Sequence, residues 1–216
     1  HFLHLKHSDS RSLVVAFRDF LFVAEAPLNS VNGELIIKKA HELYPNKPIK
    51  YFAYGHFHNW YVGGARPFVA EGATILAPKP SSEYVSYILQ TNHSLQPDRL
   101  STSTRKPSIT TFTDSLRIGD GEFEIVLYLI GEKSKHTIDY VVFYLPSEKL
   151  LFQGDLSWIS ADGDVKPASD RQAGLYAAIK ELNLDVQIIK QSWPIEGHNV
   201  KNTIPFSELE KSVLTR

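Results

Sequence analysis

The sequence carries nine histidines, and two of them have the spacing of metal ligands. His56 and His58 follow residues 49–54, IKYFAY, an apolar run of strand length. In an extended chain residues i and i+2 point to the same face, so the two imidazoles are expected to lie side by side. Imidazole is the commonest side-chain metal ligand in proteins. The His-x-His pattern alone is a weak predictor, and it needs further ligands elsewhere in the chain.

Three more residues that can bind a metal stand beside other predicted strands. They are His136 before the strand 138–145, Asp155 after the strand 150–152, and His198 in a turn after the strand 186–190. Because loops from the ends of strands converge on one rim of a sheet, we expect all five residues to meet in one cleft. Three imidazoles and a carboxylate form a ligand set suited to Zn²⁺.

The remaining histidines are less informative. His1, His4 and His7 have the pattern of a metal-binding tract, but a frayed chain terminus is the favoured interpretation. His41 falls on a predicted helix and is expected at the surface or half-buried. His93 falls in the polar stretch 91–107, which is predicted to be a long surface loop and offers this histidine no evident partner.

The elements that must position these residues alternate between strands and helices. Residues 12–17 and 20–24 predict a β-hairpin with its turn at Arg18-Asp19, and Asn32 is the predicted N-cap of a helix that ends near Tyr44. Further helices are predicted over 64–70, 81–90, 170–182 and 205–214, and further strands over 74–77, 108–112, 115–118 and 122–130. This order favours the α+β class, with mixed sheets and outer helices, in a single domain that spans residues 1–216.

Composition excludes several classes of protein. Hydrophobic residues make up 43% and charged residues 22%, which is typical of a globular chain. The net charge of −1 predicts no nucleic-acid partner, and no apolar run reaches the length of a membrane span. The chain has no cysteine, which excludes disulfides and thiolate nucleophiles but is compatible with both a periplasmic and a cytoplasmic location. A nucleophile elbow of the G-x-S-x-G type and a glycine-rich phosphate loop are absent.

Four segments together resemble the metallo-β-lactamase-fold hydrolase superfamily. They are VVAFRDFLFVAEAP, KPIKYFAYGHFHNWYVGGARPFVAEGATILA, the lone His136 ahead of DYVVFYLPSEKLLFQGD, and the final EGH at residues 196–198. The chain looks most similar to an uncharacterised bacterial branch. The resemblance implies an αββα sandwich, in which two mixed β-sheets pack face to face with helices outside. It also implies that the 216 residues are the C-terminal portion of a longer chain.

The resemblance also implies a ligand set, from which this chain departs at two positions. The superfamily signature H-x-H-x-D-H, followed by x-G-G, places the first metal on His56, His58 and His136. The second metal would use the signature Asp and His with His198, and Asp155 would bridge both ions. Trp60 and Tyr61 stand where that Asp and His are expected. We therefore predict that these two aromatic residues block the second metal-binding site and that the protein binds one zinc ion at most.

Two functions follow from this incomplete site. One is a one-zinc hydrolase of unknown small-molecule substrate, because a single zinc on three imidazoles still lowers the pKa of bound water to about 7. Asp155 and His198 would then be catalytic residues that hold the water and the substrate. The other is a non-catalytic pseudoenzyme or binding module that keeps the fold. Arg66 could meet an anionic substrate, but an ion pair with Glu71 or a neighbour is the favoured role.

Overall fold

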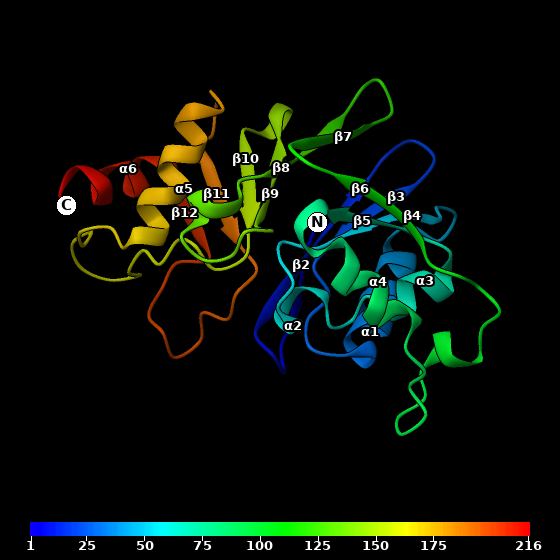
Figure 1. Ribbon diagram of the computed structural model, residues 1–216. Helices are drawn as coiled ribbons and strands as arrows, with labels where there is room; N and C mark the ends of the chain where they lie inside the picture. The colour runs from blue at the N-terminus through cyan, green and yellow to red at the C-terminus, as the bar shows by residue number, and fades with distance from the viewer. The chain divides into compact units, whose positions relative to one another are not determined.

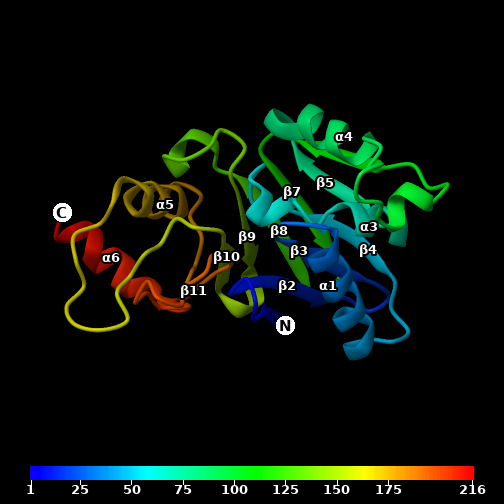
Figure 2. The same cartoon turned by 90° about the horizontal axis from the view of Figure 1, so that it is seen from below.

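The computed structural model describes all residues, His1–Arg216, and divides into two compact units, residues 1–113 and residues 114–216. Figures 1 and 2 show the elements of the first unit in colours from blue to green and those of the second from green to red. Each unit is built on one six-stranded mixed sheet. The α+β class with mixed sheets and flanking helices, which the sequence predicts, is therefore observed.

The sheet of the first unit has its strands in chain order, β1-β2-β3-β4-β5-β6. The pairs from β1 to β3 are antiparallel and the pairs from β3 to β6 are parallel. The strands are β1 (Phe2–Leu5), β2 (Ser10–Ala16), β3 (Leu21–Ala24), β4 (Ile49–Ala53), β5 (Thr74–Pro78) and β6 (Ser108–Phe112). Parallel strands need crossovers, and these carry the helices α1 (Ser30–Leu43), α2 (Asn59–Val62), α3 (Arg66–Glu71) and α4 (Ser82–Gln90).

The predicted hairpin is confirmed, and the prediction of a frayed N-terminus is wrong. Strands β2 and β3 pair antiparallel, and the Phe17 amide donates to the Phe20 carbonyl across the turn at 2.9 Å. The preceding residues form β1, which pairs antiparallel with β2. Two of the terminal histidines also have partners within the unit, because His4 Nε2 lies 2.8 Å from Asp9 Oδ1 and His7 Nε2 lies 2.7 Å from Asn32 Oδ1.

Helix α1 begins one turn earlier than the sequence predicts. Its N-cap is Asn29, whose side-chain oxygen accepts from the Asn32 amide at 3.2 Å. Asn32 is instead buried, and its side chain donates to the Pro27 carbonyl at 3.0 Å. Both asparagines are capable caps, and the choice between them depends on this buried contact, which the local sequence does not reveal.

The helical segment predicted after Gly63-Gly64 is observed as the short helix α3, and a further short helix that was not predicted, α2, precedes the two glycines. A Cβ atom on Gly33 of α1 would lie 2.2 Å from the Gly64 carbonyl oxygen, so this crossing requires glycine at residue 33. Helix α3 is fixed to the sheet by its aromatic side chain, because the Phe68 ring stacks on Phe52 of β4 with 4.3 Å between centroids. The glycine contact therefore sets the distance between residues 63–64 and α1.

The sheet of the second unit has the order β12-β11-β10-β9-β8-β7, and only β10 and β11 are parallel. Its strands are β7 (Ser115–Gly119), β8 (Glu124–Leu129), β9 (Val141–Leu145), β10 (Leu150–Gln153), β11 (Ile188–Gln191) and β12 (Thr203–Pro205). Helices α5 (Asp170–Glu181) and α6 (Phe206–Leu214) pack on one face of this sheet. Their Leu175, Ile179 and Leu209 join Tyr140, Val142 and Ile189 in one buried cluster.

Two predicted boundaries in the second unit differ from the structure. Strand β9 begins at Val141 rather than near residue 138, because the preceding residues 131–134 form a 3₁₀ turn that ends at Lys135 in the left-handed conformation. His136 therefore lies in the loop between that turn and β9. The edge strand β12 was not predicted, since its three residues are too few for a periodic pattern. No helix of the structure has the length and apolar character needed to cross a membrane.

We expect Gly33→Ala to lower the free energy of unfolding by about 2 kcal/mol, because the close contact with Gly64 outweighs the gain of about 1 kcal/mol in helix propensity. Urea unfolding monitored by circular dichroism measures the change. The matched control is Lys38→Ala, an exposed position of the same helix, which should stay within about 0.5 kcal/mol of the parent. A stable Gly33→Ala variant would show that the crossing tolerates a side chain.

Candidate metal centre

His56 and His58 lie in the bend that leads from β4 into α2. The strand ends at Ala53, so the two histidines are not on an extended strand, yet their side chains lie side by side as the spacing predicts. His56 Nε2 lies 3.0 Å from His58 Nδ1, and the ring centroids are 4.6 Å apart. His56 is buried and His58 is half-buried. The first unit thus presents two converging imidazole nitrogens.

Backbone hydrogen bonds hold residues 59–64, which directly follow the histidine-bearing bend, against the segment between β3 and α1. The Ala26 amide donates to the Tyr61 carbonyl at 2.9 Å, the Leu28 amide to the Asn59 carbonyl at 2.7 Å, and the Gly64 amide to the Ala26 carbonyl at 2.8 Å. Because these bonds join main-chain atoms, they fix the path of residues 59–64 independently of their side chains.

Trp60 and Tyr61, which stand where the superfamily signature has Asp and His, lie in α2. Tyr61 is buried, and its ring packs against His56 with 4.1 Å between centroids, so it supports one face of that imidazole. Trp60 is half-buried. Replacement of Tyr61 would therefore also disturb the ring that it supports. That these residues block a second metal seat stays a prediction.

In the second unit, His136 and Asp155 lie next to each other. His136 Nε2 is 3.4 Å from Asp155 Oδ2, and both side chains are largely buried. Asp155 follows β10 directly, as predicted, and the Tyr140 hydroxyl donates to its Oδ1 at 3.0 Å while accepting from the Asp155 amide at 2.9 Å. Tyr140 therefore fixes both the backbone and the carboxylate at the end of this strand.

Arg171 neutralises the Asp155 carboxylate, a contact that the sequence did not predict. Its Nη1 donates to Asp155 Oδ2 at 3.1 Å from the first turn of α5. The two residues are 16 positions apart and on different elements, so no local pattern connects them. The carboxylate thus already has a cation at the oxygen that also faces His136.

His198 packs against Trp158 in the second unit. Its exposed ring meets the edge of Trp158, with 5.6 Å between centroids, and it makes no hydrogen bond with Asp155. The indole Nε1 of Trp158 donates to the Asp155 carbonyl at 2.8 Å, so one side chain separates the two predicted residues. His198 and Trp158 line a cavity of about 230 Å³ together with Lys166 and Gln172.

The donor spacings within each unit fit a tetrahedral zinc ion. With Zn–N and Zn–O distances near 2.0–2.2 Å, two ligands of such an ion lie roughly 3.3–3.5 Å apart. The pair His56–His58 at 3.0 Å and the pair His136–Asp155 at 3.4 Å are close to this value. Nitrogen and carboxylate donors are also the right chemistry for zinc.

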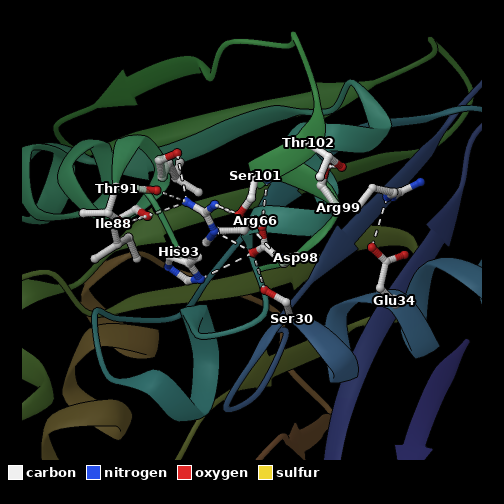
Figure 3. A network of polar contacts seen from close by, with 11 residues as sticks. Ser30, Glu34, Arg66, Ile88, Thr91, His93, Asp98, Arg99, Ser101 and Thr102 are labelled. Carbon is white, nitrogen blue, oxygen red and sulfur yellow. Dashed lines mark hydrogen bonds and ion pairs between the residues drawn. The ribbon is translucent and has the colours of Figure 1, made fainter. Parts of the chain in front are cut away.

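Arg66 does not serve as a substrate contact, and Glu71 is not its partner. Figure 3 shows its guanidinium on Asp98, with Nε 2.6 Å from Oδ2 and Nη2 3.0 Å from Oδ1. It also donates to the carbonyls of Ile88 and Thr91 at 3.2 and 2.9 Å. Arg66 therefore ties α3 to the end of α4 and to the loop 91–107, which contains a 3₁₀ turn at Arg99–Thr102.

Glu71 pairs instead with two other cations. It accepts from Arg99 Nη1 at 2.9 Å and lies 2.7 Å from His41 Nε2. His41 is half-buried, as predicted. His93, for which no partner was predicted, has its Nδ1 3.6 Å from Asp98 Oδ2.

Comparison with proteins of known sequence returns no match to any family model or to any curated protein. Comparison with solved structures does give matches. The metallo-β-lactamase from Pontibacter korlensis covers 100% of this chain and 91% of its own, at TM-score 0.67 and 16% identity. The FIM-1 metallo-β-lactamase from Pseudomonas aeruginosa, in its mono-zinc form, covers 99% and 87% at TM-score 0.65 and 16% identity. TMB-1 covers 99% and 89% at TM-score 0.65 and 15% identity.

The chain therefore has the metallo-β-lactamase fold. The α+β class that the sequence predicts, with two mixed sheets and flanking helices, is confirmed by these matches, which extend over nearly the whole chain. Identities of 14–16% establish the fold and leave the reaction open.

We expect Asp98→Asn to destabilise the protein by about 3–5 kcal/mol at pH 7, because it leaves the Arg66 guanidinium buried without a carboxylate. Burial raises the pKa of Asp98, but hydrogen bonds from Arg66, Ser30 and Ser101 outweigh burial and hold this pKa well below its usual range.

The sign of the pH dependence follows from that lowered pKa. The stability due to ionised Asp98 is complete above its unfolded pKa of about 3.9 and is lost as the pH falls towards the lower folded value. The difference between parent and Asp98→Asn should thus shrink below about pH 4. Urea unfolding at pH 7 and pH 3 measures it, with exposed Asp19→Asn as the control. An equal difference at both pH values would contradict the assignment.

Proposed function

We propose that the protein is a metal-dependent hydrolase that holds one zinc ion on His56, His58 and His136. The observation that carries the proposal is the convergence of His56 Nε2 and His58 Nδ1, 3.0 Å apart, in a chain with the metallo-β-lactamase fold. The mono-zinc form of the similar FIM-1 enzyme supports a single ion. A zinc ion on this set would supply Lewis acidity and a lowered pKa for water.

Other residues of the chain would orient the water and contact the substrate. We propose that Asp155, fixed by Tyr140 and Arg171, orients the attacking water and that His198 contacts the substrate. We infer that Arg171 favours one ion over two, because its guanidinium adjoins Asp155 Oδ2, a carboxylate oxygen that could otherwise bind a cation. At an effective dielectric constant of 20, a divalent ion about 4 Å from that guanidinium would meet a repulsion on the order of 8 kcal/mol.

Metal content tests the proposal directly. We expect the purified protein to retain about one zinc per chain after dialysis, and His56→Ala to lose it, because two remaining imidazoles hold zinc poorly. Mass spectrometry of the metal content is the measurement, and His93→Ala, a half-exposed histidine of the same unit, is the control that should retain zinc. Anomalous scattering at the zinc edge would locate the ion between His56, His58 and His136.

A protein that stays metal-free and folded in chelator would contradict the hydrolase proposal. That result would favour the alternative that the sequence leaves open, a non-catalytic binding module that keeps the fold.

A designed second site tests why only one ion binds. The double change Trp60→Asp with Tyr61→His supplies ligands to accompany Asp155 and His198, but Arg171 remains. We therefore expect the second zinc to bind at least tenfold more tightly when Arg171→Met is added, because the competing charge is removed. Zinc titration followed by calorimetry compares the double and triple variants, and Lys211→Met is the control for loss of an exposed cation.

The aromatic changes should cost about 3 kcal/mol or more of stability without metal, since Tyr61 is buried, and zinc should restore part of it. Equal affinity of the double and triple variants for the second zinc would show that Arg171 does not control the metal count.

A further inference from the structure

Two exposed aromatic side chains stand beside the histidine pair. Phe57, which lies between His56 and His58 in the sequence, keeps 39% of its surface exposed, and Tyr84 on α4 keeps 46%. The Phe57 ring meets His58 edge-on, with 4.6 Å between centroids, and meets Tyr84 edge-on at 5.8 Å. The three rings therefore form a continuous series from the imidazole to the surface of α4.

The packing of α4 does not require an aromatic residue at position 84. Val85 and Leu89 are the side chains by which this helix is buried in the first unit, at 0% and 2% exposure. The Tyr84 hydroxyl makes no hydrogen bond within the chain, so neither burial nor polar pairing explains the residue. Large apolar groups that remain exposed side by side are a feature of binding surfaces.

Phe57 is equally unexplained by folding. Its neighbour His56 is fully buried and packs against Tyr61, whereas Phe57 stays accessible. A polar residue would serve a solvent-facing bend at lower cost in exposed apolar surface. The ring is in direct contact with His58, so a ligand held at this imidazole would meet it.

We propose that Phe57 and Tyr84 form an aromatic platform for the substrate, and that the substrate carries an aromatic or large apolar group next to the bond that is hydrolysed. This inference rests on the proposed function in so far as His58 is taken as a metal ligand. Edge and face contacts between rings favour such a group over a small aliphatic one. The platform would thus select the substrate class, while the histidines would supply the metal.

Two zinc-chelating probes separate the platform from the metal. Benzohydroxamate and acetohydroxamate carry the same chelating group and differ by a phenyl against a methyl group. Calorimetry on the zinc-loaded protein should show benzohydroxamate bound at least tenfold more tightly, and Tyr84→Ser or Phe57→Ser should reduce that preference to about threefold or less. Acetohydroxamate affinity should stay unchanged in both variants.

Tyr87→Ser is the matched control, because Tyr87 is an exposed tyrosine of the same helix, 67% exposed, that makes no ring contact with Phe57. It should keep the full preference. A preference that survives both Tyr84→Ser and Phe57→Ser, or that Tyr87→Ser lowers equally, overturns the proposal. All three substitutions are at exposed side chains, so the variants should fold like the parent, which circular dichroism checks.

A second arm distinguishes failure of the platform from failure of the metal centre. Absence of zinc and of acetohydroxamate binding would contradict the proposed function alone. Phenol titrated into chelator-treated protein then tests the platform without metal, by nuclear magnetic resonance. Shifts confined to the resonances of residues 57, 58 and 84 support it, and no shift there at saturating phenol overturns it.

Discussion

The close approach of two backbones at Gly33 and Gly64 is the constraint on which the candidate centre depends. It allows residues 59–64 to lie against α1 and the preceding segment, where three backbone hydrogen bonds hold the chain directly after the bend that carries His56 and His58. Side chains then complete the support, since Tyr61 packs on His56. A metal site requires ligands held within fractions of an ångström, and main-chain contacts provide that rigidity.

Charge compensation shapes the rest of the molecule. Two largely buried carboxylates each receive a guanidinium from a distant element, Asp98 from Arg66 and Asp155 from Arg171. The first pair is structural and joins α3, α4 and the loop 91–107. The second lies beside His136 and occupies an oxygen that a cation could otherwise bind. The same chemistry thus stabilises one region and limits the metal count that we propose for the other.

Each functional proposal is supported by a different set of side chains. The fold by itself carries many reactions, so the argument for a hydrolase depends on the facing imidazoles rather than on the sheets. The exposed rings of Phe57 and Tyr84 support an aromatic substrate. Because the proposed metal ligands and the proposed platform are different side chains, each can be varied while the other is measured.

The sequence by itself determined most strands and most helix positions and nominated five candidate ligands, because apolar periodicity and residue spacing are local properties. It predicted that His56 and His58 face each other and that Asp155 follows β10. Only the tertiary structure decided how the polar groups pair. Arg66 meets Asp98 across 32 positions, Arg171 meets Asp155 across 16, and the N-cap of α1 is Asn29 because the Asn32 side chain is bonded to the Pro27 carbonyl. Such contacts depend on which surfaces folding brings together, and no local pattern encodes them.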